Sequence, residues 1–213
     1  MILIHYIHCL IYQVDPWTGS INSTYKSVLN SLNEAQLDYW DLVLIHTPES
    51  GRSSRLKAYE DLSKLVDQGK VKAIGLSNYG KHHIEELLST NPRYNPVVNQ
   101  IELHPFFFND VATYCQSKNI IVQTYCPLAR RYHLKDQNLV KIANEVNATP
   151  AQVMLKWAVN KGFVPLPKSG NPNRQQENAD SLKIELNDQV MKQIDNLNRN
   201  DPVEFQCSVQ DMP

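Results

Sequence analysis

The sequence predicts an α/β fold built on a parallel sheet that is buried on both faces. Short apolar runs alternate with longer amphipathic stretches through most of the 213 residues, which is the arrangement that βαβ units produce. The apolar runs are hydrophobic throughout and do not alternate with polar residues, as expected of strands covered on both faces. Polar residues follow several of these runs at their carboxyl ends, where α/β proteins hold their functional sites.

Residues 1–12, MILIHYIHCLIY, form the first apolar run, and we expect a buried strand there. A signal peptide is the alternative interpretation. The run, however, has no basic segment before it, contains two histidines and is not followed by a small-residue cleavage site. It is also too short to span a bilayer.

The other strands and helices follow in alternation. Segment 55–68 carries Leu56, Tyr59, Leu62 and Val66 at helical spacing, and Gly69 is expected to end that helix. Asn109 is expected to cap a helix that runs to about residue 118, and Pro150 to lie in the first turn of another. Strands are expected at 42–45, 71–76, 96–101, 120–125 and 163–166, and further helices at 81–88, 138–146, 150–160 and 188–197.

Two parallel architectures are compatible with this order. The doubly wound dinucleotide fold requires a G-x-G-x-x-G turn after its first strand, and none of the 7 glycines forms one. The (β/α)₈ TIM barrel is therefore the prediction. Because a closed barrel of this kind has eight strands and only about six are found, we expect the barrel to be incomplete. About two βα units of roughly 30 residues each would then precede Met1.

The expected strands deliver polar or aromatic residues to one rim of this barrel. Each residue alone has an ordinary structural alternative: a histidine after a strand is commonly structural, and an asparagine there commonly caps a helix or forms a turn. Five consecutive strand ends with such residues favour a functional site. We expect His46, Ser77-Asn78, Gln100, Tyr125 and Lys168-Ser169 to surround a single opening.

The charge balance excludes some classes of partner. The formal net charge of -1 and the pI of about 6.6 favour neither nucleic acid nor a membrane surface. The four cysteines show neither C-x-x-C pairing nor zinc-ligand spacing, so we expect free thiols in a reducing compartment and no metal site. The prediction is a cytoplasmic monomer.

Five ordered segments carry a resemblance to the aldo-keto reductase family, which extends from about residue 28 to the C-terminus. On this basis the chain is expected to be one partial aldo-keto reductase domain, residues 1–213, with a divergent segment at 1–27. The matching segments are LDY-x-DLVLIH at 37–46, GLSNY at 75–79, NQIELHP at 99–105, YCPL at 125–128 and PLPKS at 165–169.

The resemblance implies NADPH-dependent reduction of an aldehyde or ketone to an alcohol. A tyrosine would be the general acid, and a lysine and an aspartate would adjust the pKa of that tyrosine. A histidine orients the substrate carbonyl, and His46 is the one residue here that matches a member of this catalytic set. The lysine should end the strand expected at 1–12, but the first lysine of the chain is Lys26. The matching tyrosine and aspartate would lie before Met1.

The same resemblance implies a nearly complete cofactor site. Tyr125 would stack on the nicotinamide ring, while Ser77, Asn78 and Gln100 would hold its carboxamide, for which an amide offers a paired donor and acceptor. Lys168, Ser169 and Arg174 would bind the 2′-phosphate, Glu177 and Asn178 the adenine, and Leu128 of the YCPL segment also belongs to the cofactor set. Cys126 and Gly170 depart from the family pattern and weaken the expected pyrophosphate contacts.

Three functions remain open at this point. The chain is a working NADPH-dependent carbonyl reductase, a catalytically inactive NADPH-binding regulator or sensor, or a fragment whose longer parent is the enzyme. A general acid near the carbonyl oxygen is required for the first. Since only His46 is matched, the second or third is favoured for the chain as written. The sequence does not specify the carbonyl substrate.

Overall fold

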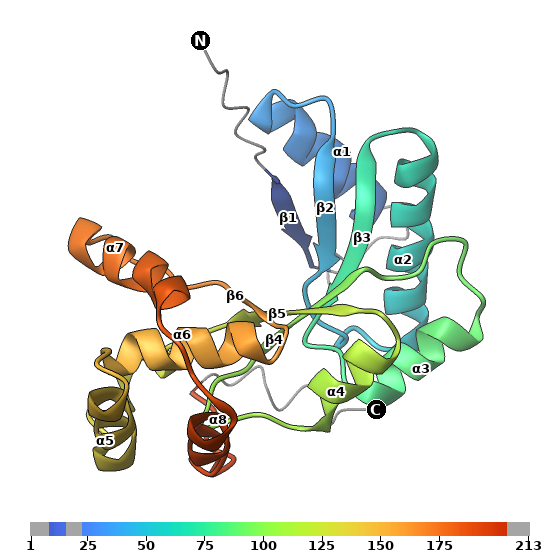
Figure 1. The fold of residues 1–213 in the computed structure, drawn as a ribbon. Helices are drawn as coiled ribbons and strands as arrows, with labels where there is room; N and C mark the ends of the chain where they lie inside the picture. The colour runs from blue at the N-terminus through green and yellow to red at the C-terminus, as the bar shows by residue number, and fades with distance from the viewer. Residues whose placement is uncertain (1–8, 16–22, 204–213) are drawn as a thin grey trace. The chain divides into compact units, whose positions relative to one another are not determined.

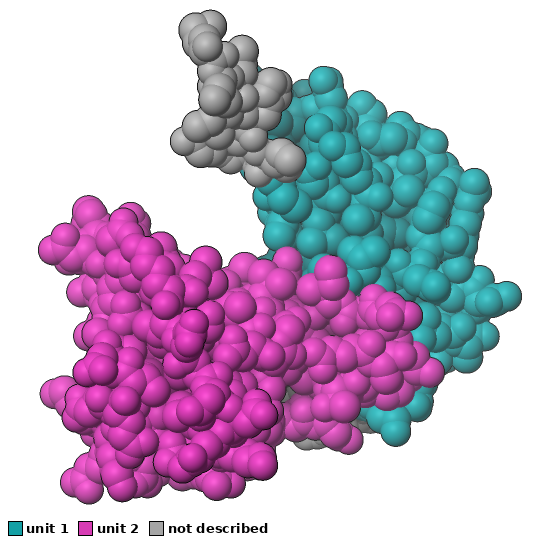
Figure 2. Space-filling view, in the orientation of Figure 1, with its two compact units in different colours: residues 1–98, 209–213 teal, residues 99–208 magenta. Residues whose placement is uncertain are grey.

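The computed structural model describes residues 9–15 and 23–203 of the chain (Figure 1). These residues form two compact units, which Figure 2 colours separately. The first unit contains the described residues up to Val98, and the second contains those from Asn99 onward. Each unit has its own strands and covering helices, and each is described by itself below.

In the first unit, three parallel strands alternate with helices, as the sequence predicted. The strands are β1 (Ile11–Val14), β2 (Trp40–Ile45) and β3 (Val71–Ser77), and β2 pairs with both of the others. Val14 lies opposite Ile45, which lies opposite Leu76, so the carboxyl ends of the three strands are aligned. The helices are α1 (Ser23–Ala35), α2 (Arg52–Asp67) and α3 (Lys81–Ser89), and β4 (Val98–Glu102) begins at the last residue of this unit.

The helix predicted at 55–68 is present as α2, but its buried face differs slightly from the predicted one. Tyr59 and Leu62 are buried as expected, whereas Leu56 and Val66 are only partly buried. Ala58 and Leu65 complete the face that packs inward. Gly69 follows the helix with φ of +69°, a left-handed conformation that favours glycine, so the predicted helix end is confirmed.

The second unit continues the alternation of strands and helices. β5 pairs in parallel with the two-residue strand β6, and Gln123 lies opposite Val164. Its regular elements are α4 (Asp110–Ser117), β5 (Ile121–Tyr125), the 3₁₀ helix η1 (Ala129–Arg131), α5 (Gln137–Glu145), α6 (Pro150–Asn160), β6 (Val164–Pro165), α7 (Pro172–Asp180), the 3₁₀ helix η2 (Ser181–Lys183) and α8 (Asp188–Asp195).

Local caps fix where the helices of this unit begin. The Asn109 side chain accepts a hydrogen bond from the backbone N–H of Val111, as predicted for the cap of α4. At α6, Thr149 and Gln152 form a reciprocal capping box, and Pro150 occupies the first turn. These caps hold the start of α6 in a defined position beside the loop that follows β5, which matters for the cavity described below.

The first predicted strand is only partly correct. Residues 1–8 lie outside the described part of the chain, and the strand that the structure contains runs from Ile11 to Val14. Leu10 and Ile11 are 40% and 38% exposed, so the expectation of a buried strand is wrong for these residues. The physical reason is that β1 is an edge strand, which pairs with β2 alone among the described strands. In the described residues, no helix is long and apolar enough to cross a membrane.

Candidate functional site

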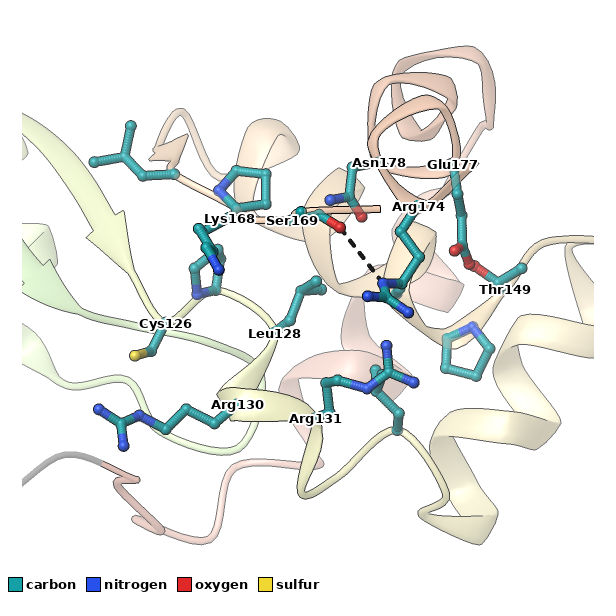
Figure 3. Close-up of a pocket in the computed structure, with 17 residues that line it drawn as sticks. Cys126, Leu128, Arg130, Arg131, Thr149, Lys168, Ser169, Arg174, Glu177 and Asn178 are labelled. Atoms are coloured by element: carbon teal, nitrogen blue, oxygen red, sulfur yellow. Dashed lines mark hydrogen bonds between the residues drawn. The ribbon is translucent and has the colours of Figure 1, made fainter. Parts of the chain in front are cut away.

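The second unit contains a cavity of about 800 Å³ (Figure 3). Three segments line it. The first is the loop after β5, from Cys126 to Leu134, the second is the start of α6, at Thr149 to Ala151, and the third is the 166–170 loop together with one face of α7. All three follow or precede regular elements of the same unit, so one compact body forms the whole cavity.

The loop between β6 and α7 is shaped by its own polar side chains. The Ser169 hydroxyl accepts a hydrogen bond from the backbone N–H of Asn171 at 3.2 Å. The Asn171 side chain in turn accepts from the backbone N–H of Arg174 at 3.1 Å and caps α7. Arg174 Nε lies 3.4 Å from Ser169 Oγ, and Gln175 Nε2 donates to the Ser169 carbonyl at 2.7 Å. Ser169 and Arg174 are therefore held beside each other at the cavity.

The loop after β5 has an unusual backbone. Cys126, Ala129, Arg130 and Arg131 have φ angles of +47°, +46°, +47° and +73°, in the left-handed region that residues other than glycine rarely adopt. Such conformations cost on the order of 1–3 kcal/mol each and gather at functional sites. Here the strained loop places two arginines at the cavity.

The charge lining the cavity is strongly positive. Arg130, Arg131, Lys168 and Arg174 line it, against the single carboxylate of Glu177. In Figure 3 the side chains of Arg131 and Arg174 extend toward one another, while that of Arg130 extends away from them. Among residues 9–15 and 23–203, no carboxylate forms an ion pair with Arg131, Lys168 or Arg174. Four cations against one carboxylate give the cavity a positive charge balance, which favours an anionic ligand over a cationic one.

Cys126 also lines the cavity and was noted in the sequence as a departure from the family pattern. Burial raises the pKa of its thiol, and a hydrogen bond with the Arg130 side chain opposes that shift. The thiol therefore adds no negative charge at neutral pH. Gly170 is the other departure, and a Cβ built there meets nothing within 4 Å, so crowding does not impose glycine at this position.

Six of the predicted cofactor residues lie together at this cavity. They are Leu128, Lys168, Ser169, Arg174, Glu177 and Asn178. The residues expected at the nicotinamide end are not among those that line it. Tyr125 is partly buried at the last position of β5, and Gln100 is buried in β4, where its Nε2 donates to Gln123 Oε1 at 3.0 Å. The expectation that all of these residues surround one opening remains a prediction.

Ser77 and Asn78 are each 1% exposed at the end of β3 in the first unit. The Asn78 amide donates to the backbone carbonyl of His46 at 3.0 Å and lies 3.3 Å from Ser77 Oγ. Asn78 has a φ of +61°, a conformation that asparagine tolerates better than most residues. The Asn78 side chain therefore links the residues that follow β2 and β3.

His46, the single predicted catalytic residue, follows the last residue of β2 and is partly buried. Its Nδ1 lies 2.8 Å from a carboxylate oxygen of Asp15, which follows the last residue of β1. Asp15 was not among the residues predicted from the sequence. The strand that precedes it was expected to end at residue 12, and Asp15 was therefore not expected at a strand end.

The cavity is also lined by residues that were not predicted from the sequence. Arg130 and Arg131 follow the YCPL segment after one residue, Ala129, and this basic pair could have been a signal. Thr149, Pro150 and Leu134 also line the cavity, but nothing in their local sequence distinguishes them from ordinary helix starts and loop residues. Their contribution depends on the packing of α6 against the loop after β5.

Comparison with known proteins identifies the family. A family model described as "Aldo/keto reductase family" matches residues 13–199. The chain belongs to the aldo-keto reductase family. The resemblance found in the sequence is thereby confirmed, and the match also includes residues 13–27, which the sequence analysis set apart as divergent.

Several curated relatives are similar over most of the chain. An uncharacterised oxidoreductase of Schizosaccharomyces pombe is 40% identical over 191 residues, which is 86% of this chain and 68% of the relative. An uncharacterised oxidoreductase of Saccharomyces cerevisiae is 38% identical, with 85% and 66% covered. Glyoxal reductase of Bacillus subtilis is 38% identical, with 85% and 65% covered. The chain thus spans about two thirds of the length of the curated relatives it matches.

Solved structures agree with this assignment. The crystal structure of MGS-M4, an aldo-keto reductase enzyme from a Medee basin deep-sea metagenome library, matches with a TM-score of 0.83 and 32% identity. That match covers 90% of this chain and 72% of the other. The crystal structure of Gox0644 in its apo form matches with a TM-score of 0.84 and 32% identity, over 91% and 71%. The predicted α/β fold class, that of the aldo-keto reductase barrels, is confirmed.

Proposed function

We propose that the second unit binds NADPH in its cationic cavity, and that the chain serves the NADPH-dependent reduction of a small aldehyde or ketone. The observation that carries the proposal is a group of three cations at one cavity, Arg131, Lys168 and Arg174, with which no carboxylate of the described residues forms an ion pair. A dinucleotide with phosphate groups is the kind of ligand that such a cavity attracts. Bound NADPH would supply the hydride for the carbonyl carbon.

Each cavity residue has a proposed role. Lys168 and Arg174 bind the 2′-phosphate, and Glu177 and Asn178 contact the adenine. The Ser169 hydroxyl donates to the Asn171 carbonyl at 3.3 Å and would turn from it to donate to the phosphate. The 2.7 Å bond from Gln175 to the Ser169 carbonyl and the cap at Asn171 hold these groups before the ligand arrives. A site organised in advance loses less free energy on binding because fewer side chains must be ordered.

For the nicotinamide end, the proposal rests on the family resemblance. Tyr125 would stack on the ring, and Ser77, Asn78 and Gln100 would hold the carboxamide. The structure adds a constraint on two of these residues, since the amide of Asn78 already donates to the His46 carbonyl and that of Gln100 to Gln123. Leu128, which lines the cavity in the loop after β5, would contact the middle of the cofactor.

The chain as written lacks matched residues for most of the catalytic set. The carboxyl end of β1 is where the family lysine would stand, and the residues there are Gln13, Val14 and Asp15. His46 alone is matched. We therefore propose that the 213-residue chain by itself binds NADPH and turns over carbonyl compounds poorly. General acid catalysis typically contributes about 10²–10⁴-fold to the rate.

The alternative function is a catalytically inactive NADPH-binding regulator or sensor. The observation that favours it is the contrast between six matched residues at one cavity and the absence of a lysine at the end of β1. Glyoxal reductase activity belongs to the Bacillus subtilis relative, and for this chain a small carbonyl compound is the proposed substrate class. A cytoplasmic location and a monomeric state are also proposals.

Two measurements test these proposals. Calorimetric titration of the 213-residue chain with NADPH and with NADH is expected to show tighter binding of NADPH, and equal affinities would contradict the 2′-phosphate site. In parallel, NADPH oxidation with a generic aldehyde should proceed at the rate seen in buffer. Robust turnover that His46→Ala abolishes would show instead that His46 is the working acid.

A gain of activity is the stronger test of the catalytic part. The variant would carry an added N-terminal segment with the family's aspartate and tyrosine, together with a lysine at the end of β1. Cys9 lies before β1, so the lysine is better introduced as Gln13→Lys, because Gln13 is exposed whereas Val14 is buried. Turnover should appear in this variant and fall again when His46→Ala is added. Without any turnover, the assignment of the catalytic positions is wrong.

A further inference from the structure

Beyond the carboxyl ends of β1 and β2, the carboxylate of Asp15 contacts the imidazole of His46. Val14 lies opposite Ile45 in the parallel register, so the next residues, Asp15 and His46, leave the sheet beside each other. Asp15 Oδ1 and His46 Nδ1 are 2.8 Å apart, and the two side chains are 56% and 32% exposed. This contact lies wholly within the first unit.

The backbone of His46 is held from both sides. Its N–H donates to the Val14 carbonyl at 3.0 Å, and its carbonyl accepts from the buried Asn78 amide at 3.0 Å. The main chain therefore cannot turn without breaking contacts to the ends of both β1 and β3. With the backbone fixed in this way, Asp15 sets the orientation of the imidazole ring.

The chemistry of the two partners decides which nitrogen carries the hydrogen. An ionised carboxylate can only accept hydrogen bonds. His46 Nδ1 must then carry the hydrogen, because the other tautomer would place two acceptors 2.8 Å apart. In neutral His46 this leaves Nε2 with a lone pair, and within the described part of the chain no residue hydrogen-bonds to Nε2.

We propose that Asp15 is a positioning residue that fixes the Nδ1–H tautomer of His46 and so leaves Nε2 as the atom offered to substrate. Neutral His46 then accepts a hydrogen bond from a substrate hydroxyl, and it donates one to a carbonyl oxygen only when it is protonated. The role at a substrate rests on the proposed function. The tautomer rests on the Asp15 contact alone.

The competing interpretation is an ordinary surface ion pair. Exposed pairs contribute roughly 0–1 kcal/mol to stability, and many have no measurable effect. Such a pair would not hold one tautomer of the ring, because both partners would exchange between conformations in water. The tautomer of His46 therefore separates the two interpretations.

The test is a long-range ¹H–¹⁵N spectrum of the imidazole groups of the ¹⁵N-labelled 213-residue chain, recorded at alkaline pH without nucleotide. The His46 signals are those lost in His46→Ala. We expect a protonated Nδ1 and an unprotonated Nε2, and a shift of both signals toward the averaged values of a free histidine in Asp15→Ala. The matched control is Asp38→Ala, which removes another exposed carboxylate of the same unit and should leave the His46 signals unchanged.

An Nε2–H tautomer in the unmodified chain would overturn the proposal, as would a spectrum of Asp15→Ala in which the His46 signals are unchanged. The first outcome needs only the unmodified chain and the His46→Ala variant that assigns its signals, so the proposal can fail even where Asp15→Ala does not fold. Diethyl pyrocarbonate, which acylates unprotonated imidazole nitrogen, supplies a second readout. His46 should be modified at Nε2 in the unmodified chain, and an unmodified His46 would contradict the accessibility of that nitrogen. Neither measurement involves NADPH, so the outcome is independent of the nucleotide titration.

Discussion

Removal of the two cations at the proposed 2′-phosphate site should weaken NADPH binding and leave NADH binding almost unchanged. The variant is Lys168→Ala with Arg174→Ala. Both residues line the cavity, neither has a carboxylate partner among the described residues, and Arg174 Nε is already held 3.4 Å from Ser169 Oγ. NADH has a hydroxyl group where NADPH has the phosphate, so it would lose no charge-assisted contact in this variant.

The size of the effect follows from the exposure of the two side chains. A hydrogen bond to a charged group contributes about 1.5–3 kcal/mol. Lys168 and Arg174 are both exposed, so solvent screening places each contact at the lower end, roughly 1–1.5 kcal/mol. Together the two substitutions should cost about 2–3 kcal/mol, which corresponds to a dissociation constant for NADPH that is roughly 30- to 150-fold larger.

The assay is isothermal titration calorimetry with NADPH and NADH at a single, low ionic strength, since salt screens exposed charges. A charge-matched control is Lys118→Ala with Lys192→Ala, which removes two exposed lysines of the same unit that do not line the cavity. That control should bind both nucleotides as the unmodified chain does. The reasoning is refuted if the cavity variant keeps its preference for NADPH, or if the control loses affinity equally.

Three further outcomes follow from the structure. Arg131→Ala should weaken NADPH and NADH binding alike, by about tenfold, which is the value of one hydrogen bond to a charged group. The reason is that Arg131 lines the cavity and is proposed to contact the pyrophosphate, which both nucleotides share. Calorimetry with both ligands tests this, and a loss confined to NADPH would place Arg131 at the 2′-phosphate instead. Gly75→Ala should lower the free energy of unfolding by about 1–3 kcal/mol, measured by urea denaturation, since a Cβ there would lie 2.4 Å from a buried Leu44 methyl carbon. Glu86→Gln should cost about 2 kcal/mol, because Glu86 receives two hydrogen bonds from the buried Arg55 guanidinium at 2.8 and 2.9 Å. Those bonds lower the pKa of Glu86 below its ordinary value of 4.5. The stability that they contribute is therefore present above pH 4.5 and is lost as the pH falls through the lowered pKa. Urea midpoints that fall equally in acid for Glu86→Gln and for the unmodified chain would exclude this linkage.

The sequence by itself determined the features that depend on neighbours along the chain. Strand and helix order followed from the apolar periodicity, and the caps at Asn109 and Thr149-Pro150 follow from side chains that bond to backbone N–H groups two or three residues ahead. The cavity residues from Lys168 to Asn178 could also be found, because loop and helix are contiguous there and a single motif leads into both.

Only the tertiary structure decided which distant residues meet. Asp15 and His46 are 31 positions apart, and their contact depends on the register of β1 against β2, which one shifted residue would abolish. Arg131 reaches the cavity because a run of left-handed backbone angles turns the loop after β5 toward α7, and neither an arginine nor an alanine signals such angles in the sequence. Both features arise from long-range packing, where the free energy of the whole unit overrides the preferences of the individual residues.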